Sequence, residues 1–261
     1  MKEIINSVGI DIGTSTTQLI FSKLTIENLA SSYTVPRISI VNTEVVYRSD
    51  IYFTPLTDKS TIDAAQVKRI VESEYDKAKM KKQDLQTGAV IITGETARKE
   101  NANDVLNALS HMAGDFVVAT AGPDLESVLS AKGAGTDVMS KDDRNTIANI
   151  DIGGGTSNIA VFRQGNLIST ACLDIGGRLV KVENGIVTYI YEKTRKLIQA
   201  ENLHISEGMK ADEGEFKKLA AVMGRHLAMA LNLMAKDEMH KVLYTTDGDA
   251  IKADIVLDGV T

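Results

Sequence analysis

The sequence predicts an α/β fold built from two duplicated lobes, and an internal repeat is the main reason. Residues 8–21 read V-G-I-D-I-G-T-S-T-T-Q-L-I-F, and residues 148–161, more than half-way along the chain, read A-N-I-D-I-G-G-G-T-S-N-I-A-V. Each copy is an apolar strand that ends in Asp, a turn of small residues, and a second apolar strand. In both halves β-rich stretches precede helical spacing, so each half reads β-β-β-α-β-α. Copies this far apart indicate two homologous lobes, because solenoid repeats are only about 20–50 residues long.

The first half is expected to begin with strands over 8–12, 18–24, 35–46 and 51–53. A helix over 63–78 follows, with Asp63 as its N-cap and Gln66 at the capping-box position. The next predicted elements are a strand over 89–93, a helix over 103–112, a strand over 116–121 and a helix over 123–133. Pro123 suits the first turn of that last helix.

The second half repeats this order. After the duplicated hairpin, strands over 158–162 and 167–174 are expected to be joined by a turn at Gln164-Gly165-Asn166. Apolar residues then keep helical spacing from Phe216 to Met234, which predicts a long core-facing helix. A last apolar strand is expected over 253–261. The predicted lobes are 1–145 and 146–261.

Composition excludes several classes of function. The chain has 261 residues, of which 43% are hydrophobic and 25% charged, as in soluble globular proteins. With 29 basic against 35 acidic residues it is acidic, so nucleic acid is not an expected partner. No stretch reaches the roughly 18 apolar residues of a membrane span, and the N-terminus lacks a signal-peptide core, so we expect a cytoplasmic protein. The four histidines form no ligand pair in sequence, and Cys172 is expected to be a buried, inert thiol.

The two Asp-containing turns have the residue types of a phosphate site. Backbone N–H groups in such a turn form an anion-binding nest, and small side chains allow close approach. Asp11 and Asp151 would repel phosphate directly but suit a Mg²⁺ ion held between carboxylate and phosphate. The candidate phosphate-binding residues are Gly13, Thr14, Ser15 and Thr16 in the first turn and Gly153, Gly154, Gly155, Thr156 and Ser157 in the second. Two such turns across a cleft would hold a polyphosphate from both sides.

A nicotinamide-binding fold is not expected. The run that begins at Gly153 starts like G-x-G-x-x-G but has Asn158 where the third glycine belongs. That fingerprint also requires a helix after the turn, whereas a strand follows here. The sequence contains no G-x-x-x-x-G-K-[ST] P-loop.

The D-I-G-T-S-T and D-I-G-G-G-T-S turns resemble the two phosphate motifs of the actin, Hsp70 and sugar-kinase superfamily. This resemblance implies an actin-like (ribonuclease H-like) fold, each lobe a mixed β-sheet with flanking helices, that binds ATP or ADP with Mg²⁺. Gly176 and Gly177 resemble the superfamily's second-lobe glycines near the phosphates, although an ordinary turn explains them equally well. Thr93, Gly94 and Glu95 also follow a strand at the expected ligand edge, where a structural loop is the favoured interpretation.

A finer resemblance extends over the whole chain. The segments I-I-T-G-E-T-A-R-K-E-N-A at 91–102, A-T-A-G-P-D-L-E-S-V-L-S-A-K-G-A-G at 119–135 and C-L-D-I-G-G-R-L-V at 172–180 look like the reactivating factors of ethanolamine ammonia-lyase. The resemblance implies an ATP- and Mg²⁺-dependent chaperone that frees this lyase from damaged cobalamin, so that intact adenosylcobalamin rebinds. It also implies a place in ethanolamine catabolism, often beside a bacterial microcompartment. A homo-oligomer is compatible with the sequence.

The chain departs from the superfamily pattern at two points. Hsp70-like ATPases carry a water-positioning Glu just before the Pro of the connecting helix, and Gly122 occupies that position here. At most a slow ATPase is therefore expected, with Asp124 or Glu126 as substitutes. The adenosine motif should follow the strand over 253–261, where the sequence stops, so the second lobe is expected to be incomplete and the chain a truncated fragment.

Two other functions remain open on the same fold. A small-molecule kinase would need a general base near the γ-phosphate, for which Glu95 or Asp124 are the candidates. A nucleotide-binding, actin-like scaffold would need no catalytic residue. We expect Asp11 and Asp151 to bind the metal, and the same two residues are the candidates for a catalytic role.

Overall fold

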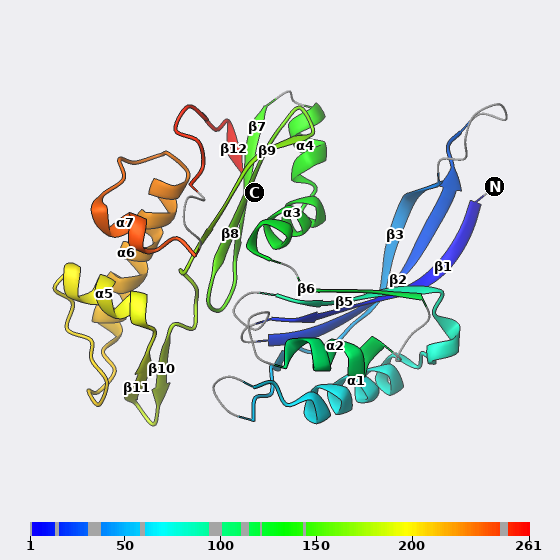
Figure 1. Cartoon of the computed structure of the whole chain (residues 1–261), viewed down its shortest axis with the longest axis horizontal. Coiled ribbons are helices and arrows are strands. Elements are labelled where there is room, and N and C mark those ends of the chain that lie inside the picture. Colours follow the sequence, from blue (N-terminus) through cyan, green and yellow to red (C-terminus); the bar gives the residue numbers. More distant parts are fainter. Residues whose placement is uncertain are drawn as a thin grey trace. The chain divides into compact units, whose positions relative to one another are not determined.

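The computed structural model describes residues 2–13, 16–30, 38–57, 61–93, 101–110, 115–120, 122–142, 145–245 and 250–261. The chain divides into two compact units, Met1–Ala121 and Gly122–Thr261, here called unit 1 and unit 2. Each unit is built around its own β-sheet (Figure 1).

Unit 1 contains a six-stranded mixed sheet with the order β3-β2-β1-β5-β6, and β4 pairs with β2. The β1–β2 and β2–β3 pairs are antiparallel, whereas β5 and β6 run parallel to β1. Its elements are β1 (Lys2–Ile12), β2 (Thr16–Asn28), β3 (Ile38–Arg48), β4 (Tyr52–Phe53), α1 (Ala64–Ala78), η1 (Lys82–Asp84), β5 (Thr87–Ile92), α2 (Ala102–Ser110) and β6 (Asp115–Thr120).

The helices of unit 1 cover one face of its sheet (Figure 1). Asp63 caps α1 as predicted, because its side chain accepts a hydrogen bond from the backbone N–H of Gln66. Alternate residues of β1 point to this face, where Val8 and Ile10 pack with Val67 and Val71 of α1. The resulting core holds β1, the strand that leads into the first Asp-containing turn.

Unit 2 contains a four-stranded sheet with the order β12-β7-β8-β9, together with a separate hairpin, β10–β11. Its elements are α3 (Pro123–Gly133), α4 (Thr136–Asp142), β7 (Thr146–Ile152), β8 (Ser157–Arg163), β9 (Asn166–Leu173), β10 (Val180–Glu183), β11 (Ile186–Ile190), α5 (Glu192–Ala200), α6 (Glu213–Ala230), α7 (Glu238–Val242) and β12 (Gly259–Val260).

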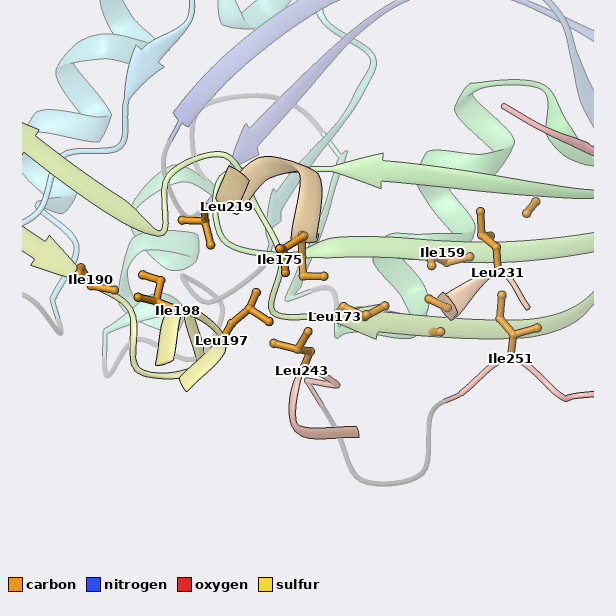
Figure 2. Packing of buried hydrophobic residues seen from close by; sticks show 14 of the residues in the cluster. Ile159, Leu173, Ile175, Ile190, Leu197, Ile198, Leu219, Leu231, Leu243 and Ile251 are labelled. Atoms are coloured by element: carbon orange, nitrogen blue, oxygen red, sulfur yellow. The ribbon is translucent and has the colours of Figure 1, made fainter. Parts of the chain in front are cut away.

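Helices lie on both faces of the unit 2 sheet (Figure 1). Neighbouring residues of β8 point to opposite faces, so Ala160 and Phe162 pack on Ala131 of α3, whereas Ile159 and Val161 belong to the larger core. Figure 2 shows side chains from α5, α6 and the end of α7 gathered along β8 and β9 in that larger core. The strands on either side of the second Asp-containing turn, β7 and β8, are therefore packed on both faces of the sheet.

The duplication is confirmed in the strand pairing. Asp11 lies opposite Gln18 in unit 1, and Asp151 lies opposite Asn158 in unit 2, so the two copies of the repeat match on both strands of the hairpin. β12 runs parallel to β7 as β5 runs parallel to β1. The predicted α/β fold class with two related mixed sheets and flanking helices is therefore correct.

Several element limits differ from the expected ones. Unit 2 begins at Gly122 and not after residue 145, because α3 and α4 pack on β7, β8 and β9. The long helix ends at Ala230 and not near Met234, since Asn232 has a positive φ of 59°. Only Gly259–Val260 of the predicted last strand pairs with β7. The hairpin β10–β11 and the helices α4, α5 and α7 were not predicted.

Two histidines that are far apart in sequence meet in the core of unit 2. The Nδ1 atoms of His226 and His240 lie 3.4 Å apart, and His240 Nε2 lies 2.9 Å from the hydroxyl of Tyr244. Both imidazoles are fully buried. Burial lowers the pKa of His226, and burial together with the neighbouring His226 lowers the pKa of His240 to about 4. Both rings are neutral at pH 7.

We predict that acid destabilises unit 2 through this histidine pair. The folded pKa values lie below the unfolded value of 6.5, so the unfolded state binds more protons as the pH falls. The contribution of the pair to the free energy of unfolding is therefore complete above pH 6.5 and is lost as the pH falls towards 4. The loss should be about 2–3 kcal/mol, because one pKa unit corresponds to roughly 1.4 kcal/mol. Urea unfolding between pH 7 and pH 4 measures this loss. His240→Gln should make the pH dependence shallower, and the same change at the exposed His204 should leave it unaltered.

Candidate functional site

The first turn joins β1 to β2 and is closed by one backbone hydrogen bond. The amide of Gly13 donates to the carbonyl of Thr16 over 2.8 Å. A Cβ atom at Gly13 would lie only 3.1 Å from that carbonyl oxygen, which favours glycine here. Asp11 is exposed and lies two residues before Gly13. Its carboxylate accepts a hydrogen bond from Thr93 Oγ1 at 3.2 Å. Thr93 follows β5, so the parallel neighbour of β1 also supplies a side chain to this edge.

Two buried threonines lie directly behind the first turn. The hydroxyl of Thr54 donates to the carbonyl of Gly13 over 2.8 Å and lies 3.1 Å from the hydroxyl of Thr17. Thr17 is fully buried and Thr54 is 8% exposed. The turn is therefore anchored to the residues that follow β4.

The second turn repeats the closing bond of the first. The amide of Gly153 donates to the carbonyl of Thr156 over 2.9 Å. The next three amides, those of Gly154, Gly155 and Thr156, have no acceptor among the residues that the structure describes. Buried or half-buried amides normally have a partner, so three successive amides without one are suited to an anion.

Asp151 is the acidic residue of the second turn. It is half-buried near the end of β7, and no described side chain forms an ion pair or hydrogen bond with it. A half-buried carboxylate without a cation is suited to a metal ion. Within the described part of the chain, no three His, Cys, Asp or Glu side chains gather into a complete metal site. A cation at Asp151 would therefore need further ligands from bound phosphate or water.

The glycines at 176 and 177 pack against the second turn. The amide of Gly177 donates to the carbonyl of Gly153 at 3.0 Å, and the amide of Arg178 donates to the carbonyl of Gly154 at 2.8 Å. A Cβ atom at Gly176 would lie 2.5 Å from the Gly154 carbonyl oxygen, closer than such atoms can approach. Gly176 is thus required for contact with the turn. The sequence left open whether Gly176 and Gly177 lie near the phosphates or form an ordinary turn, and it did not indicate this packing against the second turn.

A buried ion pair holds the segment that leads to Gly176. Lys193 Nζ of α5 lies 2.5 Å from Asp174 Oδ2, and the same Nζ donates to the carbonyl of Tyr244. The Asp174 side chain is 7% exposed and that of Lys193 is 25% exposed. The pair therefore ties the end of β9 to α5 beside the turn.

The remaining predicted residues fall into three groups. Thr14, Ser15, Gly94 and Glu95 lie outside the described residues. Ser157 is fully buried and its hydroxyl donates to the carbonyl of Ile175, so its proton is used inside the protein. Asp124, a candidate for positioning water, accepts a hydrogen bond from Thr170 of β9.

Sequence reasoning missed Thr54, Asp174 and Lys193. Thr17 aligns with Ser157 in the repeat, and this was the one signal that pointed to the buried hydroxyls. Thr54 lies outside the repeated motif and no pattern indicated it.

We predict that Gly176→Ala destabilises the protein and Gly177→Ala does not. The new Cβ at 176 would overlap the Gly154 backbone, whereas a Cβ at 177 would meet nothing within 4 Å. Overpacking of this kind costs about 1–3 kcal/mol. Urea unfolding measures both variants, and equal stabilities would contradict the close approach.

We predict that Lys193→Met lowers the free energy of unfolding by about 2 kcal/mol or more, because it leaves Asp174 buried without its cation. Lys196→Met is the matched control on the same helix. Its ion pair with Glu192 is exposed on both sides, so its removal should lower the free energy of unfolding far less than Lys193→Met does. If Lys193→Met is as stable as the control, the ion pair between Lys193 and Asp174 does not stabilise the fold.

No described helix is long and apolar enough to cross a membrane. A family model described as "Ethanolamine utilisation protein EutA" matches residues 2–260. Two curated relatives, both named "Ethanolamine ammonia-lyase reactivase EutA", come from Escherichia coli (strain K12) and Salmonella typhimurium (strain LT2). Each is 42% identical over 193 residues, which is 74% of this chain and 41% of the relative. The matched region thus spans less than half the length of these relatives.

Solved structures with a similar arrangement include the ethanolamine utilization protein EutJ from Carboxydothermus hydrogenoformans. It is 18% identical with a TM-score of 0.42, and the match covers 89% of this chain and 73% of that one. The match of the family model to residues 2–260 is the stronger finding. The chain belongs to the EutA family of ethanolamine utilisation proteins.

Proposed function

We propose that this chain is the phosphate-binding part of an ATP- and Mg²⁺-dependent chaperone that reactivates ethanolamine ammonia-lyase. The curated relatives are named for reactivation of this lyase, which supports the choice of partner. The chaperone would release damaged cobalamin from the lyase, so that intact adenosylcobalamin rebinds.

The second turn carries the nucleotide part of this proposal. Gly154, Gly155 and Thr156 present three successive amides without a protein acceptor among the described residues. These amides would donate to phosphate oxygens, and the absence of side chains at 154 and 155 allows close approach. In the proposal the first turn, from Gly13 to Thr16, is a second phosphate-binding segment.

Asp151 and Asp11 would hold Mg²⁺. Both are carboxylates beside a phosphate turn, and oxygen ligands are those that Mg²⁺ prefers. The ion neutralises phosphate charge when bound, so each carboxylate can lie near a polyphosphate that it would otherwise repel. Thr93 orients the Asp11 carboxylate through its hydroxyl.

Nucleotide state would switch the affinity for the lyase. A ligand that binds one arrangement of the two units better than another shifts their equilibrium towards it. Hydrolysis would be slow at most, because Gly122, the N-cap residue of α3, offers no side chain for a water molecule. We place this activity in the cytoplasm, often beside a bacterial microcompartment, and a homo-oligomer is compatible with it.

We predict that Asp151→Ala changes nucleotide affinity in opposite directions with and without the metal. In Mg²⁺ the variant loses a metal ligand, so its Kd for ATP should rise at least about tenfold. In EDTA the variant loses a charge that repels phosphate, so its Kd should be unchanged or lower. Calorimetric titration with ATP measures both. Asp254→Ala, at an exposed aspartate, is the control and should match the wild type. Weaker binding by Asp151→Ala in both conditions would contradict a metal role.

Capture of ethanolamine ammonia-lyase on the immobilised protein tests the partner. We expect the captured amount to change with Mg·ATP and this change to disappear in Asp151→Ala. Capture that is absent or independent of nucleotide would contradict the chaperone. Phosphate transfer from ATP to ethanolamine or a sugar would instead indicate a kinase, and nucleotide-dependent filaments would indicate a scaffold.

A further inference from the structure

The two phosphate turns share their sequence pattern but are supported by different segments. In unit 2 the support comes from the loop after β9. The hydroxyl of Ser157 donates to the carbonyl of Ile175 over 2.8 Å, and the amide of Gly177 donates to the carbonyl of Gly153 over 3.0 Å. The loop therefore makes two contacts, one with the first residue of β8 and one with the first glycine of the turn.

Unit 1 makes the same two contacts with a side chain. In the repeat, Thr17 occupies the position of Ser157, and Gly13 occupies the position of Gly153. Thr54 contacts both, because its hydroxyl donates to the Gly13 carbonyl at 2.8 Å and lies 3.1 Å from the Thr17 hydroxyl. Each hydroxyl has a single proton, so Thr17 donates to Thr54 and Thr54 donates to Gly13.

Thr54 is itself held in place by the elements around it. It follows β4, whose residues pair with Thr16 and Thr17. The hydroxyl of Tyr52 on β4 donates to Glu74 of α1 over 2.5 Å, and Lys77 donates to both of these groups. The Glu74 side chain is completely buried. Thr54 is therefore connected to the helix that packs on the sheet.

We propose that Thr54 is a positioning residue for the first phosphate turn. The Thr54 hydroxyl donates to the Gly13 carbonyl in unit 1, as the Gly177 amide donates to the Gly153 carbonyl in unit 2. The Gly177 contact with the second turn comes from a backbone amide, which a substitution leaves in place. The Thr54 contact with the first turn comes from a side-chain hydroxyl, which a substitution can remove. Its effect on nucleotide binding rests on the function proposed above, but its effect on the turn does not.

Three variants test this role. Thr54→Val keeps the shape of the side chain and removes the hydroxyl, and with it the hydrogen bonds to the Gly13 carbonyl and the Thr17 hydroxyl. Thr54→Ser restores the hydroxyl. Thr43→Val makes the same chemical change at an exposed position of β3.

The first measurement is hydrogen exchange, which needs no nucleotide. In Thr54→Val we expect amide exchange in peptides over residues 9–20 to be about tenfold faster. This rate change corresponds to a loss of about 1.4 kcal/mol in the free energy of local opening. Peptides over residues 150–160 should exchange as in the wild type. Thr54→Ser and Thr43→Val should match the wild type in both regions. Unaltered exchange over 9–20 in Thr54→Val, or equal acceleration in both regions, would overturn the proposal.

The second measurement is the Kd for Mg·ATP. We expect it to rise about tenfold in Thr54→Val and to return to within about twofold of the wild-type value in Thr54→Ser. A wild-type Kd in Thr54→Val would overturn the role in binding. If the wild-type protein itself binds no Mg·ATP, the function proposed above is wrong, and the exchange measurement still decides whether Thr54 positions the turn.

Discussion

The candidate site depends on one hydrogen bond that occurs twice. In each unit the amide of the first glycine of the turn donates to the carbonyl three residues later, from Gly13 to Thr16 and from Gly153 to Thr156. This bond lets a strand that ends in Asp reverse direction within four residues and pair with the next strand. It thereby sets the positions of Asp11 and Asp151 in matching register on the two sheets. In unit 2 it also leaves three successive amides without an acceptor among the described residues.

The same turn is supported by different chemistry in the two units. Unit 2 uses a loop that can approach closely because residue 176 is glycine, and the ion pair between Asp174 and Lys193 fixes the start of that loop. Unit 1 uses Thr54, which is tied to β4 and α1. The hairpin and its register are therefore the same in both units. The segments that hydrogen-bond to the first glycine of the turn and to the hydroxyl residue near the start of the next strand are different. A backbone carbonyl accepts a hydrogen bond from either an amide or a hydroxyl.

The sequence predicted those features that follow from local pattern. The likeness of residues 8–21 to residues 148–161 indicated the two hairpins, and Asp63 indicated the start of α1, because strand alternation and capping are local. The pairing of Lys193 with Asp174, the meeting of His226 with His240 and the contact of Thr54 with Gly13 join residues that are distant in sequence. Hydrophobic periodicity in the sequence does not indicate contacts between such distant residues. The unit boundary was placed too late for the same reason, since only tertiary packing assigns α3 to the second sheet.

In the proposed function, the second turn holds the phosphates of a magnesium nucleotide. A crystal structure of the protein with Mg²⁺ and a non-hydrolysable ATP analogue tests it most directly. We expect phosphate oxygens about 3 Å from the amides of Gly154, Gly155 and Thr156, with Mg²⁺ near Asp151. A nucleotide bound away from the second turn, or phosphates that do not contact these amides, would contradict it.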